Sequence, residues 1–181
     1  YKVARSCATK LYYRINKYPS IIDGDEYMEL LAEGGYMIGA ISSLLFENAV
    51  LVDEPDHDKA AALTKEYFKH ENIILIEAAF ESKGKFARPD ILIKQGDTLT
   101  LIEVKAKSFD STEGDPFHGK RGGLVAGWRP YLEDIAFQAL ILRELFPHAT
   151  LTCELMMPDK VKTTAIDNLH SLFALNQIAE D

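Results

Sequence analysis

Apolar positions along the chain follow either helical spacing or short β-branched runs. Apolar residues recur every three or four positions over residues 26–48 and 129–146, which predicts two amphipathic helices. A shorter helix is predicted over residues 58–70, where Asp58 can cap the first turn. Four β-branched or apolar runs predict strands, at residues 72–80, 90–94, 98–105 and 150–157.

The order of these elements predicts an α/β fold: a three-layer sandwich with a central mixed β-sheet flanked by helices. Residues 49–53 are predicted to form a short strand or loop. A last helix is predicted to begin at about Thr164. Residues 107–127 contain 5 of the 11 glycines. They predict a long loop that either clamps a nucleic-acid strand or is a surface excursion. We expect residues 1–181 to form one domain, a fragment of a longer chain because the first residue is not Met.

The pattern is sharpest in a hairpin whose strands are joined by residues 96–97. This Gly-Asp pair suits a type II′ turn, because glycine takes the positive φ that the first turn position requires. The turn pairs Gln95 with Thr98, and the same register places Asp90 opposite Glu103. The second strand is apolar on both faces, which predicts a central strand buried on both sides.

Two carboxylates and an amine therefore converge at one end of the hairpin. Residues two apart on a strand share a face, so Lys105 lies on the same side as Glu103. Facing carboxylates repel each other unless a proton or a cation lies between them. Mg²⁺ takes one or two protein carboxylates and keeps water and substrate phosphate as its other ligands. We predict that Asp90, Glu103 and the Val104 carbonyl bind Mg²⁺ or Mn²⁺ and that Lys105 positions the attacking water of a phosphodiester hydrolase.

A structural interpretation of the same residues stands beside this one. Asp90 precedes a strand, where an aspartate is often a turn residue. Glu103 and Lys105 can form a solvated ion pair. Charged groups on a buried strand need partners or a metal, which favours the catalytic interpretation.

The motif Pro89-Asp90, twelve residues, then Glu103-Val104-Lys105 resembles that of the PD-(D/E)xK nuclease superfamily. Three further segments resemble its RecB-type exonuclease branch, which includes CRISPR-associated nucleases: residues 6–14, 76–80 and 134–138. The resemblance implies a restriction-endonuclease-like fold and a DNA nuclease, an exonuclease rather than an endonuclease. It also implies that Gln138 supports the site, by holding the water or a phosphate. The alternative for Gln138 is a partly exposed position on the helix flank.

Several positions depart from the family pattern. Gly39 stands where many RecB-type nucleases have a histidine metal ligand, and Leu142 replaces a tyrosine. Glu33 can substitute for that histidine, or it is an exposed helix residue. Only Cys7 and Cys153 are present, whereas an iron–sulfur cluster needs four ligands, so we expect no cluster.

These departures keep two other functions open. One is a non-catalytic nucleic-acid-binding or interaction module on a decayed nuclease fold. The other is a metal-dependent hydrolase of a small phosphate ester, although the chain has no glycine-rich phosphate loop.

Composition adds expectations about setting and partners. The net charge of −8 argues mildly against tight nonspecific nucleic-acid binding, but a local basic groove is compatible with it. No apolar run is long enough to span a membrane, and two cysteines are too few for a disulfide framework, so we expect a cytoplasmic protein. The expected partner is DNA rather than RNA, with no membrane. Residues 2–18 are basic and aromatic, a composition able to track a backbone and stack bases. In the alternative, Leu11, Tyr12 and Ile15 pack on one face while the basic residues are solvated.

Overall fold

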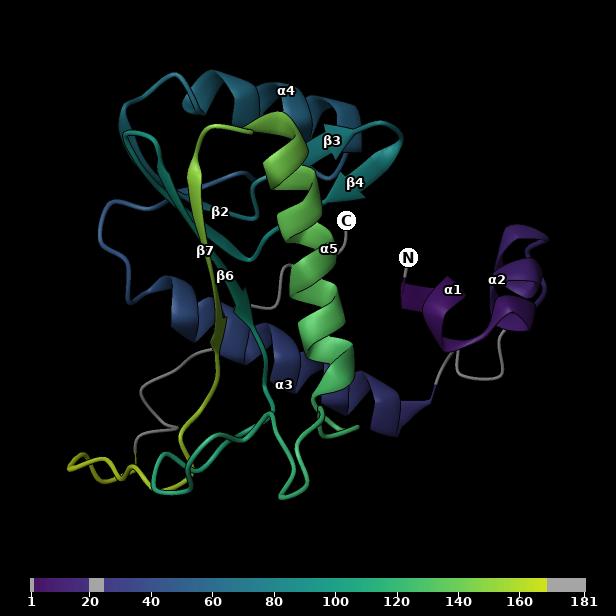
Figure 1. Cartoon of the computed structure of the whole chain (residues 1–181), viewed down its shortest axis with the longest axis vertical. Coiled ribbons are helices and arrows are strands. Elements are labelled where there is room, and N and C mark those ends of the chain that lie inside the picture. Colours follow the sequence, from purple (N-terminus) through teal and green to yellow (C-terminus); the bar gives the residue numbers. More distant parts are fainter. Residues whose placement is uncertain (1, 20–24, 169–181) are drawn as a thin grey trace.

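The computed structural model describes residues 2–19 and 25–168, which form a mixed sheet flanked by helices (Figure 1). The sheet has five strands in the order β1-β2-β5-β6-β7, and a separate hairpin is formed by β3 and β4. The strands are β1 (Val50–Leu51), β2 (Asn72–Ile76), β3 (Phe80–Ser82), β4 (Lys85–Ala87), β5 (Ile91–Gln95), β6 (Thr98–Val104) and β7 (Thr150–Met156). The helices are α1 (Lys2–Ser6), α2 (Ala8–Ile15), α3 (Glu26–Ser43), α4 (His57–Tyr67) and α5 (Arg129–Leu145).

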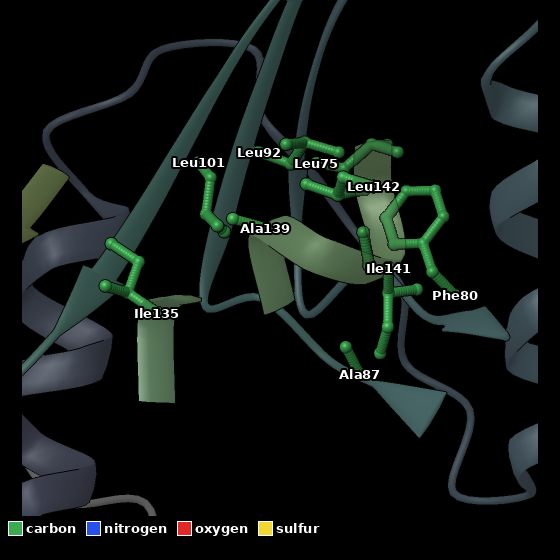
Figure 2. Close-up of a cluster of buried hydrophobic side chains, with 10 residues drawn as sticks. Leu75, Phe80, Ala87, Leu92, Leu101, Ile135, Ala139, Ile141 and Leu142 are labelled. Atoms are coloured by element: carbon green, nitrogen blue, oxygen red, sulfur yellow. The ribbon is translucent and has the colours of Figure 1, made fainter. Parts of the chain in front are cut away.

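Helices cover both faces of this sheet. On one face, α5 packs its apolar side against β2, β5 and β6, as Figure 2 shows for residues such as Leu92, Leu101 and Ala139. On the other face, Ile38 of α3 packs against a cluster that includes Ile102 of β6. The outer pairs β1–β2 and β6–β7 are parallel and the inner pairs antiparallel. The predicted α/β architecture with a mixed, helix-flanked sheet is confirmed.

The hairpin of β5 and β6 has the predicted register. Gln95 pairs with Thr98 and Ile91 with Ile102. Gly96 has a φ of +55°, the positive value that the first position of a type II′ turn requires. Strand β6 lies between β5 and β7, and five of its seven residues are buried. The prediction of a buried central strand is confirmed.

Some predicted element boundaries are wrong. Strand β2 ends at Ile76, not at residue 80, because Glu77 adopts a φ of +57° that breaks the strand. Phe80 instead begins the β3–β4 hairpin, which the sequence pattern did not reveal. Helix α4 is capped by Asp56, whose side chain accepts a hydrogen bond from the Lys59 N–H, rather than by Asp58.

Helix α3 is shorter than the predicted helix over residues 26–48, because it ends at Ser43. A Cβ added at Gly35 or Gly39 would meet no atom within 4 Å, so these glycines do not mark close backbone packing. Glu33 is exposed, in keeping with the surface interpretation.

The long loop and the C-terminal part of the described chain can be compared with their predictions. No helix or strand occupies the loop between β6 and α5 in the described chain, as predicted. Residues 164–168 form bends and turns rather than the start of a helix, and the rest of that predicted helix lies outside the described residues. Among the described residues, no helix is both long and apolar enough to cross a membrane.

Candidate active site

One cleft beneath α5 holds all four residues predicted to be catalytic. Asp90 lies directly before β5, Glu103 lies in β6 and Lys105 directly after it, and Gln138 faces them from α5. By strand alternation, Glu103 and Lys105 share the face of Leu101, which packs under α5. The four side chains border a cleft of about 920 Å³.

Asp90 connects the end of β5 to the end of β6. Its backbone lies one position beyond the last ladder pair, and its carbonyl accepts a hydrogen bond from the Glu77 N–H at 3.0 Å. Its carboxylate Oδ2 accepts a hydrogen bond from the Val104 N–H at 2.6 Å. Burial raises the pKa of Asp90, although this hydrogen bond and the Lys105 charge oppose the rise. Asp90 is therefore a fixed, half-desolvated carboxylate rather than a solvated turn residue.

Glu103 is the most enclosed acid of the site, with 3% of the residue exposed. Oε1 accepts a hydrogen bond from Lys105 Nζ, and Oε2 accepts one from Gln138 Nε2. Burial, and then the neighbouring charge of Asp90, raise the pKa of Glu103 to about 7. The two acids are thus close enough to disfavour each other's ionisation, and a cation between them would relieve that cost.

Asp134 is a site residue whose role the sequence did not reveal. Its Oδ2 lies 3.2 Å from Lys105 Nζ and 2.7 Å from Lys2 Nζ. Burial opposes ionisation of Asp134, but the hydrogen bond from Lys2, the interaction with the Glu103 carboxyl group and the charges of Lys2 and Lys105 outweigh it and lower the pKa of Asp134. Asp134 and Gln138 are four residues apart, so they share one helix face. In the sequence, the signal that could have identified Asp134 is a polar pair four residues apart in a largely apolar helix.

Lys105 lies among three carboxylates. Burial disfavours its charge, but the hydrogen bond to Glu103 and the charges of Glu103, Asp134 and Asp90 outweigh this and raise its pKa. Lys105 therefore stays protonated and available as a hydrogen-bond donor at neutral pH.

Gln138 is 5% exposed, so the predicted alternative of an exposed helix-flank position is wrong. Its Nε2 donates to Glu103, whereas its Oε1 is buried without a hydrogen-bond partner in the described structure. A buried acceptor left unpaired costs about 1–3 kcal/mol. Gln138 lines the cleft, and its unpaired oxygen is an acceptor that a bound water could satisfy.

The donor set fits a hard cation that keeps most of its water. Within residues 2–19 and 25–168, no group of three or more His, Cys, Asp or Glu side chains is placed so that it could hold a metal ion. Asp90 and Glu103 thus offer two carboxylates, which is the number that Mg²⁺ commonly takes from protein. The Val104 N–H is used by Asp90, and its carbonyl as a third ligand stays a prediction.

Glu77 and Gly39 lie together beside Asp90, outside the cleft. A second cavity of about 580 Å³ is bordered by Gly35, Gly39, Glu77 and Asp90. Burial, followed by the Asp90 charge, raises the pKa of Glu77, and its carboxylate Oε2 lies 3.1 Å from Arg88 Nε. Glu77 therefore neighbours Asp90 but is paired with an arginine.

The two ends of the long loop, residues 107–127, lie next to each other. Lys107 Nζ lies 3.8 Å from the centroid of the Trp128 ring and donates a hydrogen bond to the Gly127 carbonyl. This contact closes the loop next to Tyr131 of α5, whose ring centroid is 5.4 Å from the same ammonium. The two cysteines lie apart in the fold: Cys7 at the start of α2 and Cys153 in β7.

The lining of the cleft holds more basic than acidic side chains, although the whole chain is acidic. Lys2, Arg14, Lys85 and Arg88 line it together with Lys105. Arg88 is held by the Val52 and Glu54 carbonyls, so it also ties β4 to the segment before α4. Lysine and arginine side chains in the lining are the groups that can contact phosphates.

Comparison of the chain with models of protein families, with curated proteins and with solved structures found no match. What the site can do is therefore inferred from its own geometry and charge.

The raised pKa of Glu103 predicts a pH-dependent stability of the metal-free protein. Between pH 4.5 and about pH 7, the unfolded chain loses this proton while the folded chain keeps it. The free energy of unfolding is therefore expected to fall as pH rises through this window, by roughly 3 kcal/mol in total. Glu103→Gln cannot ionise, so it should remove this decrease and be more stable than the wild type at pH 8.

Urea unfolding in EDTA at pH 5 and pH 8 measures the effect. The exposed Glu47→Gln is the matched control and should follow the wild type. Equal loss of stability between pH 5 and pH 8 in the wild type and Glu103→Gln would show that Glu103 ionises normally.

Proposed function

We propose that this chain is a metal-dependent DNA nuclease of the PD-(D/E)xK superfamily, RecB-type branch, with a restriction-endonuclease-like fold. The observation that carries the proposal is the convergence of Asp90, Glu103, Lys105 and Gln138 in one cleft. The order and spacing of the motif support it independently, since they were read from the sequence alone.

Each residue of the site has a separate task in phosphodiester hydrolysis. Asp90 and Glu103 would hold Mg²⁺ or Mn²⁺, which supplies charge neutralisation at the phosphate and lowers the pKa of bound water. Lys105, fixed by Glu103 and Asp134, donates hydrogen bonds that position the attacking water and stabilise developing negative charge. Gln138 holds Glu103 through its amide N–H and offers its unpaired Oε1 to water. An exonuclease is favoured over an endonuclease by the resemblance.

A second candidate is a non-catalytic nucleic-acid-binding module on the same fold. One observation favours it: both carboxylate oxygens of Glu103 already accept hydrogen bonds from protein groups, Lys105 and Gln138. In such a module the lysine would take the place of the metal permanently. The unpaired Oε1 of Gln138 favours the catalytic function, because a purely structural network has no reason to leave it unsatisfied.

The proposed activity is tested by incubating end-labelled single- and double-stranded DNA with the protein in Mg²⁺, Mn²⁺ or EDTA. We expect shortening of the DNA with either metal and none in EDTA. Release of mononucleotides from one labelled end would indicate an exonuclease, and internal fragments an endonuclease. Intact DNA in every metal, with a folded protein, would favour the non-catalytic module.

A further inference from the structure

Helices α1 and α2 form an N-terminal arm, residues 2–18, that is attached to the body by little apolar packing. Neither helix contains a buried residue. In Figure 1 both helices lie to one side of α5, away from the sheet. Two ion pairs attach the arm to α5: Arg5 Nη2 lies 2.6 Å from Glu133 Oε1, and Lys2 pairs with Asp134. The arm is thus positioned beside the cleft by charged contacts to the site helix.

The arm carries a charge opposite to that of the whole chain. It contains 5 of the 20 lysines and arginines and none of the 28 aspartates and glutamates. Lys10 and Arg14 are four residues apart and share one face of α2. Arg14 and Leu11 also line the catalytic cleft, so this face continues into the site. Such segregation of positive charge is typical of a surface that binds phosphates.

The arm also exposes three tyrosines in one cluster. The ring centroid of Tyr13 lies 5.8 Å from that of Tyr12 and 5.0 Å from that of Tyr18. Tyr12 is 58% exposed, Tyr13 48% and Tyr18 57%. The alternative in which Tyr12 packs together with Leu11 and Ile15 is therefore wrong for Tyr12. Exposed aromatic faces beside cations are the features that bind unpaired bases and the backbone of a single strand.

We propose that the N-terminal arm binds single-stranded nucleic acid and guides the strand into the cleft. The proposal rests on the nuclease function for the fate of the strand, but not for its binding. Arg14 contacts a phosphate at the cleft mouth, and the Tyr13 cluster stacks with bases outside it. A duplex keeps its bases stacked on each other, so it can use only the charges of the arm.

Fluorescence anisotropy in EDTA tests the arm without cleavage, with labelled oligo(dT), oligo(rU) and a duplex of equal length. We expect at least one single strand to bind about tenfold more tightly than the duplex. Tyr13→Ala should weaken single-strand binding about tenfold without changing its salt dependence, and Tyr13→Phe should restore it. Arg14→Ala should weaken binding and reduce the slope of log K against log salt by about 0.7, the loss of one phosphate contact.

Lys59→Ala on α4 is the matched control, since it removes an exposed cation that does not line the cleft. Circular dichroism of each arm variant checks that the helices persist. Equal affinity for single strand and duplex would overturn the inference, as would unchanged affinity in both Arg14→Ala and Tyr13→Ala. Binding only to anionic lipid vesicles, which basic aromatic segments also favour, would overturn it in favour of a membrane surface.

The outcomes for the arm and for the catalytic site are separable. A chain that binds single strands through the arm in EDTA but cleaves nothing in any metal supports this inference and contradicts the nuclease. A chain that cleaves DNA while its arm variants bind normally contradicts this inference alone.

Discussion

Asp90→Asn is expected to lower metal-dependent DNA cleavage about a thousandfold, because a metal site that loses one of two carboxylates loses several kcal/mol of transition-state stabilisation. Asparagine tests the role of the Asp90 charge more specifically than alanine does. Its side-chain oxygen can still accept the hydrogen bond that the Val104 N–H donates to Asp90, so the junction of β5 and β6 is kept. The change therefore removes charge and leaves the local structure intact.

The initial rate of cleavage over a range of Mn²⁺ concentrations measures this loss. Asp53→Asn is the control, an exposed aspartate in the segment between β1 and α4. A variant Asp90→Asn that keeps more than about a tenth of the wild-type rate at saturating Mn²⁺ would remove Asp90 from the set of metal ligands.

Lys105→Ala is expected to lower the turnover number about a hundred- to a thousandfold while Mn²⁺ still binds. The lysine donates hydrogen bonds in the site, and removing one such donor to developing charge has a cost of this size. Its loss also frees Glu103 Oε1, so metal affinity should not fall. This split between turnover and metal affinity separates Lys105 from Asp90.

Turnover and the Mn²⁺ concentration at half-maximal rate are measured on the same DNA, with Lys59→Ala as the control for loss of a cation. Loss of metal affinity in Lys105→Ala, in parallel with turnover, would mean that the lysine organises the metal site rather than the water. Wild-type turnover would exclude it from the chemistry.

Local rules account for what the sequence predicted about the site. The two-residue turn at 96–97 sets the register of β5 and β6, and the strand period then places Asp90, Glu103 and Lys105 on one face. The turn and the three site residues all lie within the sixteen residues from Asp90 to Lys105, so the prediction needed no long-range contact. The Gln138 prediction drew on the resemblance as well.

What the sequence did not predict depends on contacts between distant segments. The ion pair of Lys2 with Asp134 joins residues 132 positions apart, and no local pattern encodes it. Glu77 has a positive φ that ends β2, and its N–H donates a hydrogen bond to the carbonyl of Asp90, directly before the adjacent strand β5. Gly35 and Gly39 of α3 border a cavity together with Asp90, a neighbourhood formed by segments far apart in the sequence.

The most direct test of the central claim is a titration of Mn²⁺ into the pure protein, followed by the electron paramagnetic resonance signal of free Mn²⁺. Binding is a property of the chain itself, so traces of a contaminating nuclease cannot imitate it. We expect saturable binding by the wild type and by Asp53→Asn, and its loss in Asp90→Asn. Binding that is equally strong in Asp90→Asn, or absent from the folded wild type at neutral pH, would contradict a metal site at Asp90 and Glu103.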